Sequence, residues 1–259
     1  MDEERLREMA ADTRFVAGIY NYCDRWCERC GYTSRCLNYA ISQEEFAGKD
    51  EDEQWKALGQ LMRQTASMVR TEMEEDGVDF DTALQEEAES RDVIDLKAEQ
   101  QPFCAQARDY MKAASAWFDS AREVFEMEKE EINDALRLEL PRTHPEQTAR
   151  TLNDATETIR WYQHQIYVKL IRAGRGIMHR EEPADFELED ANGSAKVALI
   201  GIDRSIRAWD TLYRTLRDGQ DEILDVLVRL ERLRKTAEAT FPGARTFVRP
   251  GLDELPEEP

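Results

Sequence analysis

The sequence lacks the features that mark membrane-spanning and fibrous proteins. Its 259 residues include only 12 Gly and 8 Pro, and the longest uninterrupted apolar run is residues 197–202. That run is far too short to span a bilayer, which takes about 20 apolar residues. The chain opens with acidic residues rather than with a basic stretch and an apolar run, so no targeting segment is indicated. With 41% apolar residues, we expect a globular cytoplasmic protein.

Positive charge is also scarce. The chain has 35 Lys and Arg against 55 Asp and Glu, a net charge of -20. A surface of this sign repels phosphate backbones and anionic lipid. We therefore expect no nucleic-acid partner and no membrane partner, whereas a protein partner is compatible with the charge and the oligomeric state stays open. The acids are spread along most of the chain, where they also keep long helices soluble. The net charge alone therefore does not identify a partner.

The common catalytic signatures are absent. No Gly-rich phosphate loop, G-x-S-x-G elbow or H-E-x-x-H pair occurs, and these mark many nucleotide-binding proteins and hydrolases. None of the three histidines has a Glu three positions before it, so the Glu-x-x-His steps of ferritin-like di-iron bundles are missing as well. The sequence thus specifies no reaction, and it leaves open whether the protein is an enzyme.

Helical periodicity is what the sequence has in abundance. Apolar residues recur at three- and four-residue steps in almost every long segment, and strict alternation is rare, which predicts an all-α fold. We expect an up-and-down bundle of long helices with extra covering helices. The predicted helices cover residues 3–30, 34–41, two parts of 50–100 divided at Gly77, 102–140, 146–180, and a last stretch after an acidic loop through Phe186 and Asn192-Gly193 that pauses at Asp218-Gly219.

The predicted domain organisation is simple. Residues 1–241 are expected to form a single helical domain, with the cysteine cluster at residues 23–36. The first helix is predicted to end in this cluster, at Gly31, where the chain turns. Residues 242–259 are expected to form an extended or disordered acidic tail.

Four cysteines within this cluster are the most specific feature of the chain. Cys23, Cys27, Cys30 and Cys36 have the spacing C-x3-C-x2-C-x5-C. If the first helix continues through Cys30, three of the sulfurs share one face, because each residue turns a helix by about 100°. Gly31 would then let the chain reverse and bring in the fourth. In a reducing compartment such cysteines are ligands more often than disulfides, so we predict that all four bind metal.

Two kinds of metal centre suit four thiolates, namely tetrahedral zinc and a [4Fe-4S] cluster. Zinc sites commonly use two separated pairs of ligands, whereas here all four lie in one short stretch. Tyr22, Trp26 and Tyr32 are at hand to shield a cluster from water. We therefore favour a [4Fe-4S] cluster over zinc, and four unligated cysteines packed in a helix corner remain the alternative. The fifth cysteine, Cys104, is predicted to be a small core residue.

Parts of the cysteine motif resemble known iron-sulfur proteins. The C-x3-C-x2-C portion resembles the cluster motif of radical S-adenosylmethionine enzymes, which use three cysteines in a β/α barrel, whereas this chain has a fourth cysteine and no predicted strands. The ten residues from Cys27 to Cys36, with Tyr32 between them, resemble the iron-sulfur staple of certain recombination and CRISPR-adaptation nucleases. Those enzymes have a mixed α/β catalytic core. The resemblance therefore implies a type of cluster and not an activity.

A second group of candidate residues lies in the apolar helices. His164 is in a segment that is apolar nearly all round, and Asp203 and Asp210 lie in the apolar run that includes Trp209. We hypothesise that His164 is buried and lines a pocket with the two acids, since a desolvated acid can transfer protons. The alternative is that these acids form salt bridges with nearby arginines.

Three functions follow from these patterns. In the first, the cysteine site is a structural staple and the bundle binds a protein partner. In the second, the site is an iron-sulfur centre that transfers electrons or senses oxidants. In the third, the protein is an enzyme with a pocket between helices near His164 and Asp203. The first is favoured, and the third ranks last because no motif specifies a reaction.

Overall fold

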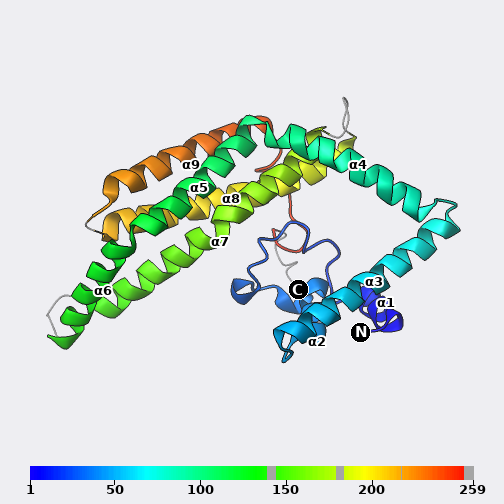
Figure 1. The fold of residues 1–259 in the computed structure, drawn as a ribbon, viewed down its shortest axis with the longest axis horizontal. Coiled ribbons are helices and arrows are strands. Elements are labelled where there is room, and N and C mark those ends of the chain that lie inside the picture. The colour runs from blue at the N-terminus through cyan, green and yellow to red at the C-terminus, as the bar shows by residue number, and fades with distance from the viewer. Residues whose placement is uncertain (139–143, 179–183, 217, 254–259) are drawn as a thin grey trace, which may run out of the picture. The chain divides into compact units, whose positions relative to one another are not determined.

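The computed structural model describes residues 1–138, 144–178, 184–216 and 218–253 (Figure 1). Every regular element in these ranges is a helix, which confirms the predicted all-α fold. No described helix is both long enough and apolar enough to cross a membrane. By its contacts the chain forms two compact units, an N-terminal unit of Met1–Val93 with the segment from Val248, and a C-terminal unit of Ile94–Phe247. The single domain of residues 1–241 stays a prediction.

The N-terminal unit consists of helices joined by a long irregular segment. Its elements are α1 (Glu3–Ala11), the 3-10 turns η1 (Cys27–Arg29) and η2 (Thr33–Arg35), α2 (Leu37–Phe46), α3 (Glu51–Glu75) and the first part of α4 (Phe80–Glu99). Asp50 and Glu53 form a capping box at the start of α3, which satisfies backbone N–H groups that the helix leaves open. Gly77, with φ +77°, follows α3 in the left-handed conformation, so the predicted division at this residue is confirmed.

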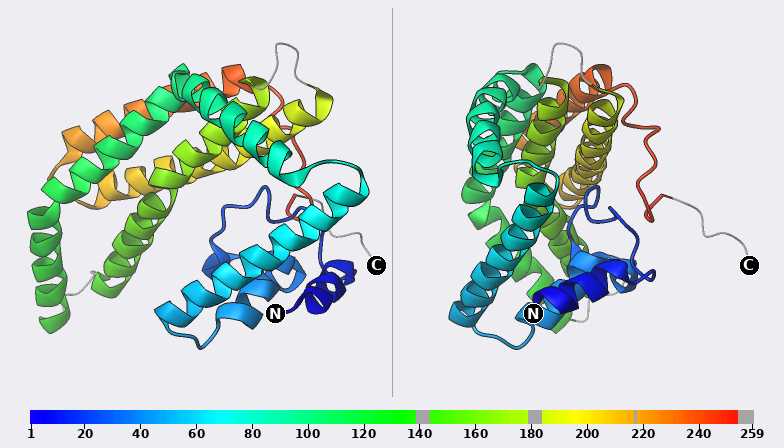
Figure 2. Two further views of the ribbon diagram at one scale, coloured as in Figure 1. Left: turned by 45° about the vertical axis from the view of Figure 1, so that its right-hand side comes forward. Right: turned by 90° about the vertical axis from the view of Figure 1, so that its right-hand side faces the viewer.

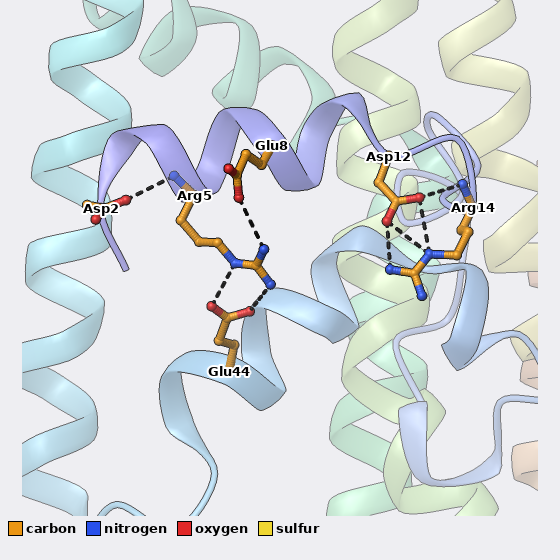
Figure 3. A network of polar contacts seen from close by, with 6 residues as sticks. All are labelled: Asp2, Arg5, Glu8, Asp12, Arg14 and Glu44. Atoms are coloured by element: carbon orange, nitrogen blue, oxygen red, sulfur yellow. Dashed lines mark hydrogen bonds and ion pairs between the residues drawn. The ribbon is translucent and has the colours of Figure 1, made fainter.

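The first helix is much shorter than the sequence suggested. The prediction of a helix that continues into the cysteine cluster is wrong, because α1 ends at Ala11. Asp12 leaves helical geometry, and its carboxylate accepts a hydrogen bond from the backbone N–H of Arg14 at 2.9 Å and pairs with the Arg14 guanidinium at 2.6 Å (Figure 3). An Asp side chain that bonds its own backbone competes with the helix. Gly18, at φ +75°, then turns the chain again.

Polar contacts and a few close approaches hold the N-terminal unit together. Arg5 on α1 reaches Glu44 on α2 with a nitrogen–oxygen distance of 3.0 Å (Figure 3). The C-terminal segment returns to this unit, where a Cβ built on Gly251 would lie 2.9 Å from a methyl carbon of Val16 and 3.2 Å from Ile19. Residues 242–253 are therefore mainly turns packed on other segments rather than the extended tail that was predicted. Residues 254–259 of that tail lie outside the described residues.

The C-terminal unit is built from long helices that pack side by side. They are α5 (Pro102–Ser120), α6 (Arg122–Arg137), α7 (Pro145–Met178), α8 (Asp185–Thr215) and α9 (Gln220–Thr240). Helix α7 packs along α8, α8 along α9, α9 along α5, and α5 along α7, so these four enclose a common core (Figure 2). Helix α6 packs mainly on α7. The pause predicted before α9 is confirmed at Gly219, whose φ is +78°.

Large side chains fill this core. Trp209, Tyr110 and Tyr162 are almost fully buried, and the indole N–H of Trp209 donates a hydrogen bond to the Tyr110 hydroxyl oxygen at 3.3 Å. Burial raises the pKa of Tyr110 to about 12, because the anion would lose its hydration. At Gly201 a Cβ would lie 2.8 Å from a ring carbon of Tyr162, so α7 and α8 approach closely where glycine has no side chain.

Two helix boundaries in this unit differ from the prediction. The helix expected over residues 102–140 is broken at Ala121 (φ -80°, ψ 4°) into α5 and α6, and its expected end at Leu140 and Pro141 lies outside the described residues. The acidic loop expected through Phe186 and Asn192-Gly193 is wrong, because α8 starts at Asp185. Buried small residues on α8, Gly193 among them, pack against neighbouring helices, so tertiary packing overrides a local turn signal.

Candidate metal centre

The four cysteines lie in the irregular segment between α1 and α2, not on one helix face. Cys27 opens η1 and Cys30 ends it, with the Cys30 N–H donating to the Cys27 carbonyl at 3.2 Å. Cys36 ends η2 in the same way, through a bond from its N–H to the Thr33 carbonyl at 3.2 Å. The shared helix face predicted for the first three sulfurs is therefore wrong. Cys27, Cys30 and Cys36 are instead positioned by the short turns η1 and η2, and Cys23 lies in a bend before them.

Despite this different backbone, all four cysteines line one small cavity of about 30 Å³. A cavity needs roughly 10–15 Å³ in this measure to hold one water molecule, so this one has room for a particle of atomic size. The rest of its wall is aromatic, apolar and polar, and consists of Ile19, Asp24, Arg25, Trp26, Tyr32, Thr33, Tyr39 and Leu252.

Some of these wall residues were foreseen and others were not. Trp26 and Tyr32 contribute as the sequence suggested, whereas Tyr22 does not line the cavity and Tyr39 does. Leu252 comes from the far end of the chain. No local pattern could have marked it, because its place follows from the return of the C-terminal segment to the N-terminal unit.

Local hydrogen bonds position several of these cysteines. The Tyr32 N–H donates to the sulfur of Cys30 at 3.4 Å. Cys36 is the N-terminal cap of α2, with its carbonyl accepting the N–H of Ala40 at 3.0 Å. The Cys23 thiol donates to the Tyr20 carbonyl at 3.5 Å.

Proximity of the other cysteines affects the ionisation of Cys27. Burial raises the pKa of Cys27, and the negative charges of Cys23, Cys36 and Cys30 raise it further. All three other cysteines therefore act on the same thiol. Four thiolates this close together repel one another, and a bound cation reverses that repulsion because it is the largest local charge.

In the structure, however, the four thiols do not have the geometry of a set of metal ligands. Among the described residues, no group of three or more His, Cys, Asp or Glu side chains has the geometry to hold a metal ion. No disulfide joins the five cysteines, all of which are described. Rotation between staggered rotamers moves a cysteine sulfur without moving the backbone. Thiolates are suitable metal ligands, and ligation of one metal by all four would require the sulfurs to turn towards the middle of the cavity they share.

Positive charge is concentrated in this segment of an otherwise acidic chain. From Cys23 to Cys36 it carries Arg25, Arg29 and Arg35 against two acids. Arg25 lines the cavity and has φ 54°, a left-handed conformation that is uncommon outside glycine. The Arg29 guanidinium lies 4.1 Å from the Trp26 ring centroid. A metal held by four thiolates has a net negative charge, which such cations balance.

Cys104 differs from the other four cysteines in every respect. It is fully buried in α5, as expected for a small core residue. Burial, assisted by the charge of Glu99, raises its pKa to about 12. A thiol of this kind is unreactive and does not bind metal.

The second group of candidate residues is more exposed than predicted. His164 lies on the exposed side of α7, so the buried environment expected for it is wrong. Asp203 pairs with Arg245 at 2.6 Å, and Asp210 pairs with Arg214 at 2.8 Å, four residues away on the same helix. None of the three lines either the cysteine cavity or the groove described below. Their catalytic role stays a hypothesis.

Comparison with known proteins adds no assignment. The chain matches no protein-family model, no curated protein and no solved structure.

Proposed function

We propose that Cys23, Cys27, Cys30 and Cys36 hold a metal centre that staples the N-terminal unit. One observation carries this proposal, namely that all four cysteines line the same cavity, although no helix brings them together. Cysteines left unligated have no reason to converge from separate turns. Metal thiolates do, because each bond to the metal contributes free energy that orders the chain.

The occupant that we propose is a [4Fe-4S] cluster. All four ligands come from one short segment, and Trp26, Tyr32 and Tyr39 in the cavity wall would shield a cluster from water. The N–H directed at the Cys30 sulfur is the kind of hydrogen bond that tunes such clusters. Zinc is the second candidate, because a cavity of about 30 Å³ accepts one ion with less movement of the segment than a four-iron cube requires.

A stapling role follows from what the site joins. The cavity wall includes residues near the start of the irregular segment, the cysteines, Tyr39 of α2 and Leu252 of the returning C-terminal segment. A metal there would tie three parts of the N-terminal unit that have few other buried contacts. The four helices α5, α7, α8 and α9, which we infer to be an up-and-down bundle, are then left to bind a protein partner.

Anaerobic purification tests the proposal. We expect about four irons and four sulfides per chain and a broad visible band that bleaches on reduction, with the metal lost in Cys27→Ser and kept in Cys104→Ala. About one zinc and no colour would support the staple with zinc as its metal. A band that bleaches and returns reversibly under mild reductants would add a redox role. Absence of iron and zinc from freshly purified wild-type protein would refute the metal centre.

A further inference from the structure

A groove lies within the C-terminal unit between α6 and the first half of α7. Its volume is about 880 Å³, and the ribbons of α6 and α7 diverge from each other (Figure 2). Its apolar lining includes Phe125, Ile132 and Leu136 from α6, together with Leu152 from α7. The described residues leave this volume unfilled.

The apolar residues of α6 lie mainly on one face of the helix, but no residue of α6 is buried. Its groove-lining apolar side chains follow steps of seven and four residues, the pattern of a helix face that packs against another helix. In the other long helices of the C-terminal unit such a face is covered, with Trp117 of α5, Ile159 of α7 and Leu230 of α9 all buried. An apolar face of this kind in a soluble protein marks an interaction surface.

The charge of the groove restricts its partner. Four acidic and four basic side chains line it, so it is neutral overall on a chain whose net charge is -20. Pairs of opposite sign alternate along its edges, with Lys129 3.3 Å from Glu126 and Arg150 3.7 Å from Glu146. A basic partner would be drawn to the acidic remainder of the surface and would gain nothing from these arginines and lysines.

A second copy of the chain suits this surface better. In a twofold interface the same patch meets itself, so a patch that carries both signs around an apolar centre is self-complementary. The acidic remainder repels other copies, which leaves the neutral groove as the place where two copies can approach. We propose that the α6–α7 groove is a homodimer interface in which α6 of one copy packs against the groove of the other. The proposal is independent of the metal centre.

A pair of matched variants on α6 tests the interface by sedimentation velocity and light scattering. Leu136 lines the groove and is 44% exposed, whereas Met127, 49% exposed, is on the same helix but does not line it. We expect wild-type protein to be a dimer at about 100 μM, a concentration well above the dissociation constant of an ordinary specific interface. Leu136→Glu should raise the dimer dissociation constant about tenfold or more, because it buries a charge, and Met127→Glu should leave it unchanged.

The outcomes separate the alternatives. If Leu136→Glu fails to fold, Asn133→Glu, which changes an exposed polar residue of the same groove, replaces it with the same expected loss of dimer. A wild-type chain that is monomeric at about 100 μM would overturn the proposal and point to a different protein in the groove. A dimer that both groove variants leave intact would also overturn it, since the interface would then lie elsewhere.

Discussion

The C-terminal unit and the cysteine segment are ordered by different means. In the C-terminal unit, regular helices bury large side chains such as Trp209 and Tyr162 almost completely. In the cysteine segment, the two turns η1 and η2 have no buried residue at all. Burial of apolar surface is the dominant favourable term in folding. The C-terminal unit is therefore stabilised by its buried side chains, whereas η1 and η2 have no such stabilisation.

The difference is the physical reason for proposing a metal in the second region. Fixing the backbone costs roughly 1–2 kcal/mol per residue, and the cysteine segment gains little from burial to offset that cost. A structural zinc contributes about 10–16 kcal/mol of apparent binding free energy in small metal-folded peptides. A bound metal would therefore supply the stabilising free energy that apolar burial does not supply in this segment. The four following predictions test the contrast between the two regions.

Truncation of the core should have the largest effect. Trp209→Ala removes a buried indole and the hydrogen bond to Tyr110, so we expect a loss of about 3–5 kcal/mol in the free energy of unfolding of the C-terminal unit. Urea unfolding followed by circular dichroism measures it. Val168→Ala, at a site 59% exposed on α7, is the control and should change stability by less than about 0.5 kcal/mol. Equal effects of the two variants would contradict the burial account.

Loss of one cysteine should disorder the other region and spare the bundle. We expect Cys27→Ser to lose the metal and to be cut by proteases between Asp12 and Cys36 about tenfold faster than wild type. Most of the helical circular dichroism signal should remain. Cys104→Ala is the matched control and should keep the metal and the protection. Identical cleavage patterns in Cys27→Ser and wild type would contradict the staple.

Addition of one methyl group should test the close approach of α7 and α8. Gly201→Ala places a carbon 2.8 Å from the Tyr162 ring, so we expect a loss of about 1–3 kcal/mol. Gly59→Ala in α3 makes the same chemical change where the nearest atom lies 3.5 Å away. There the better helix propensity of alanine should add up to about 1 kcal/mol. Thermal unfolding of both variants measures the contrast, and a gain in both would refute the close approach of α7 and α8.

The smallest effect should come from the ion pairs on α8. Asp203→Asn weakens the contact with Arg245, but the carboxylate is 30% exposed, so we expect a loss of only about 0.5–1 kcal/mol. Asp210→Asn breaks a more exposed pair and should cost less. A double-mutant cycle with Arg245→Ala measures the coupling of Asp203 and Arg245. Additive effects of the two substitutions would show that the pair contributes nothing.

Much of the fold was predictable because apolar residues at three- and four-residue steps indicate long helices. The helix predicted over residues 146–180 corresponds to α7, and Gly77 and Gly219 marked turns that their positive φ angles confirm. Local turn signals gave the wrong prediction where packing against other helices determines the backbone conformation. Asn192-Gly193 looks like a turn, yet it is helical because Gly193 is buried among packed helices.

The four candidate ligands could be named from the sequence, but the backbone that positions them could not. The spacing predicts Cys23, Cys27, Cys30 and Cys36 as metal ligands, which stays a prediction, and the structure places all four around one cavity. Periodicity suggested a continuous helix, but it does not show that the Asp12 carboxylate accepts a hydrogen bond from the backbone N–H of Arg14 where α1 ends. Leu252 could not be foreseen, because only the folded chain brings it to the cavity.

X-ray absorption at the metal edge of the purified protein is the most direct test of the four-thiolate centre. We expect a first shell of sulfur only, at about 2.3 Å if the metal is zinc, and a further shell of iron neighbours if the occupant is a cluster. Removal of Cys27 should then reduce the number of sulfur ligands or abolish binding. A first shell dominated by oxygen or nitrogen, or one that persists unchanged in Cys27→Ser, would contradict the metal centre proposed for these four cysteines.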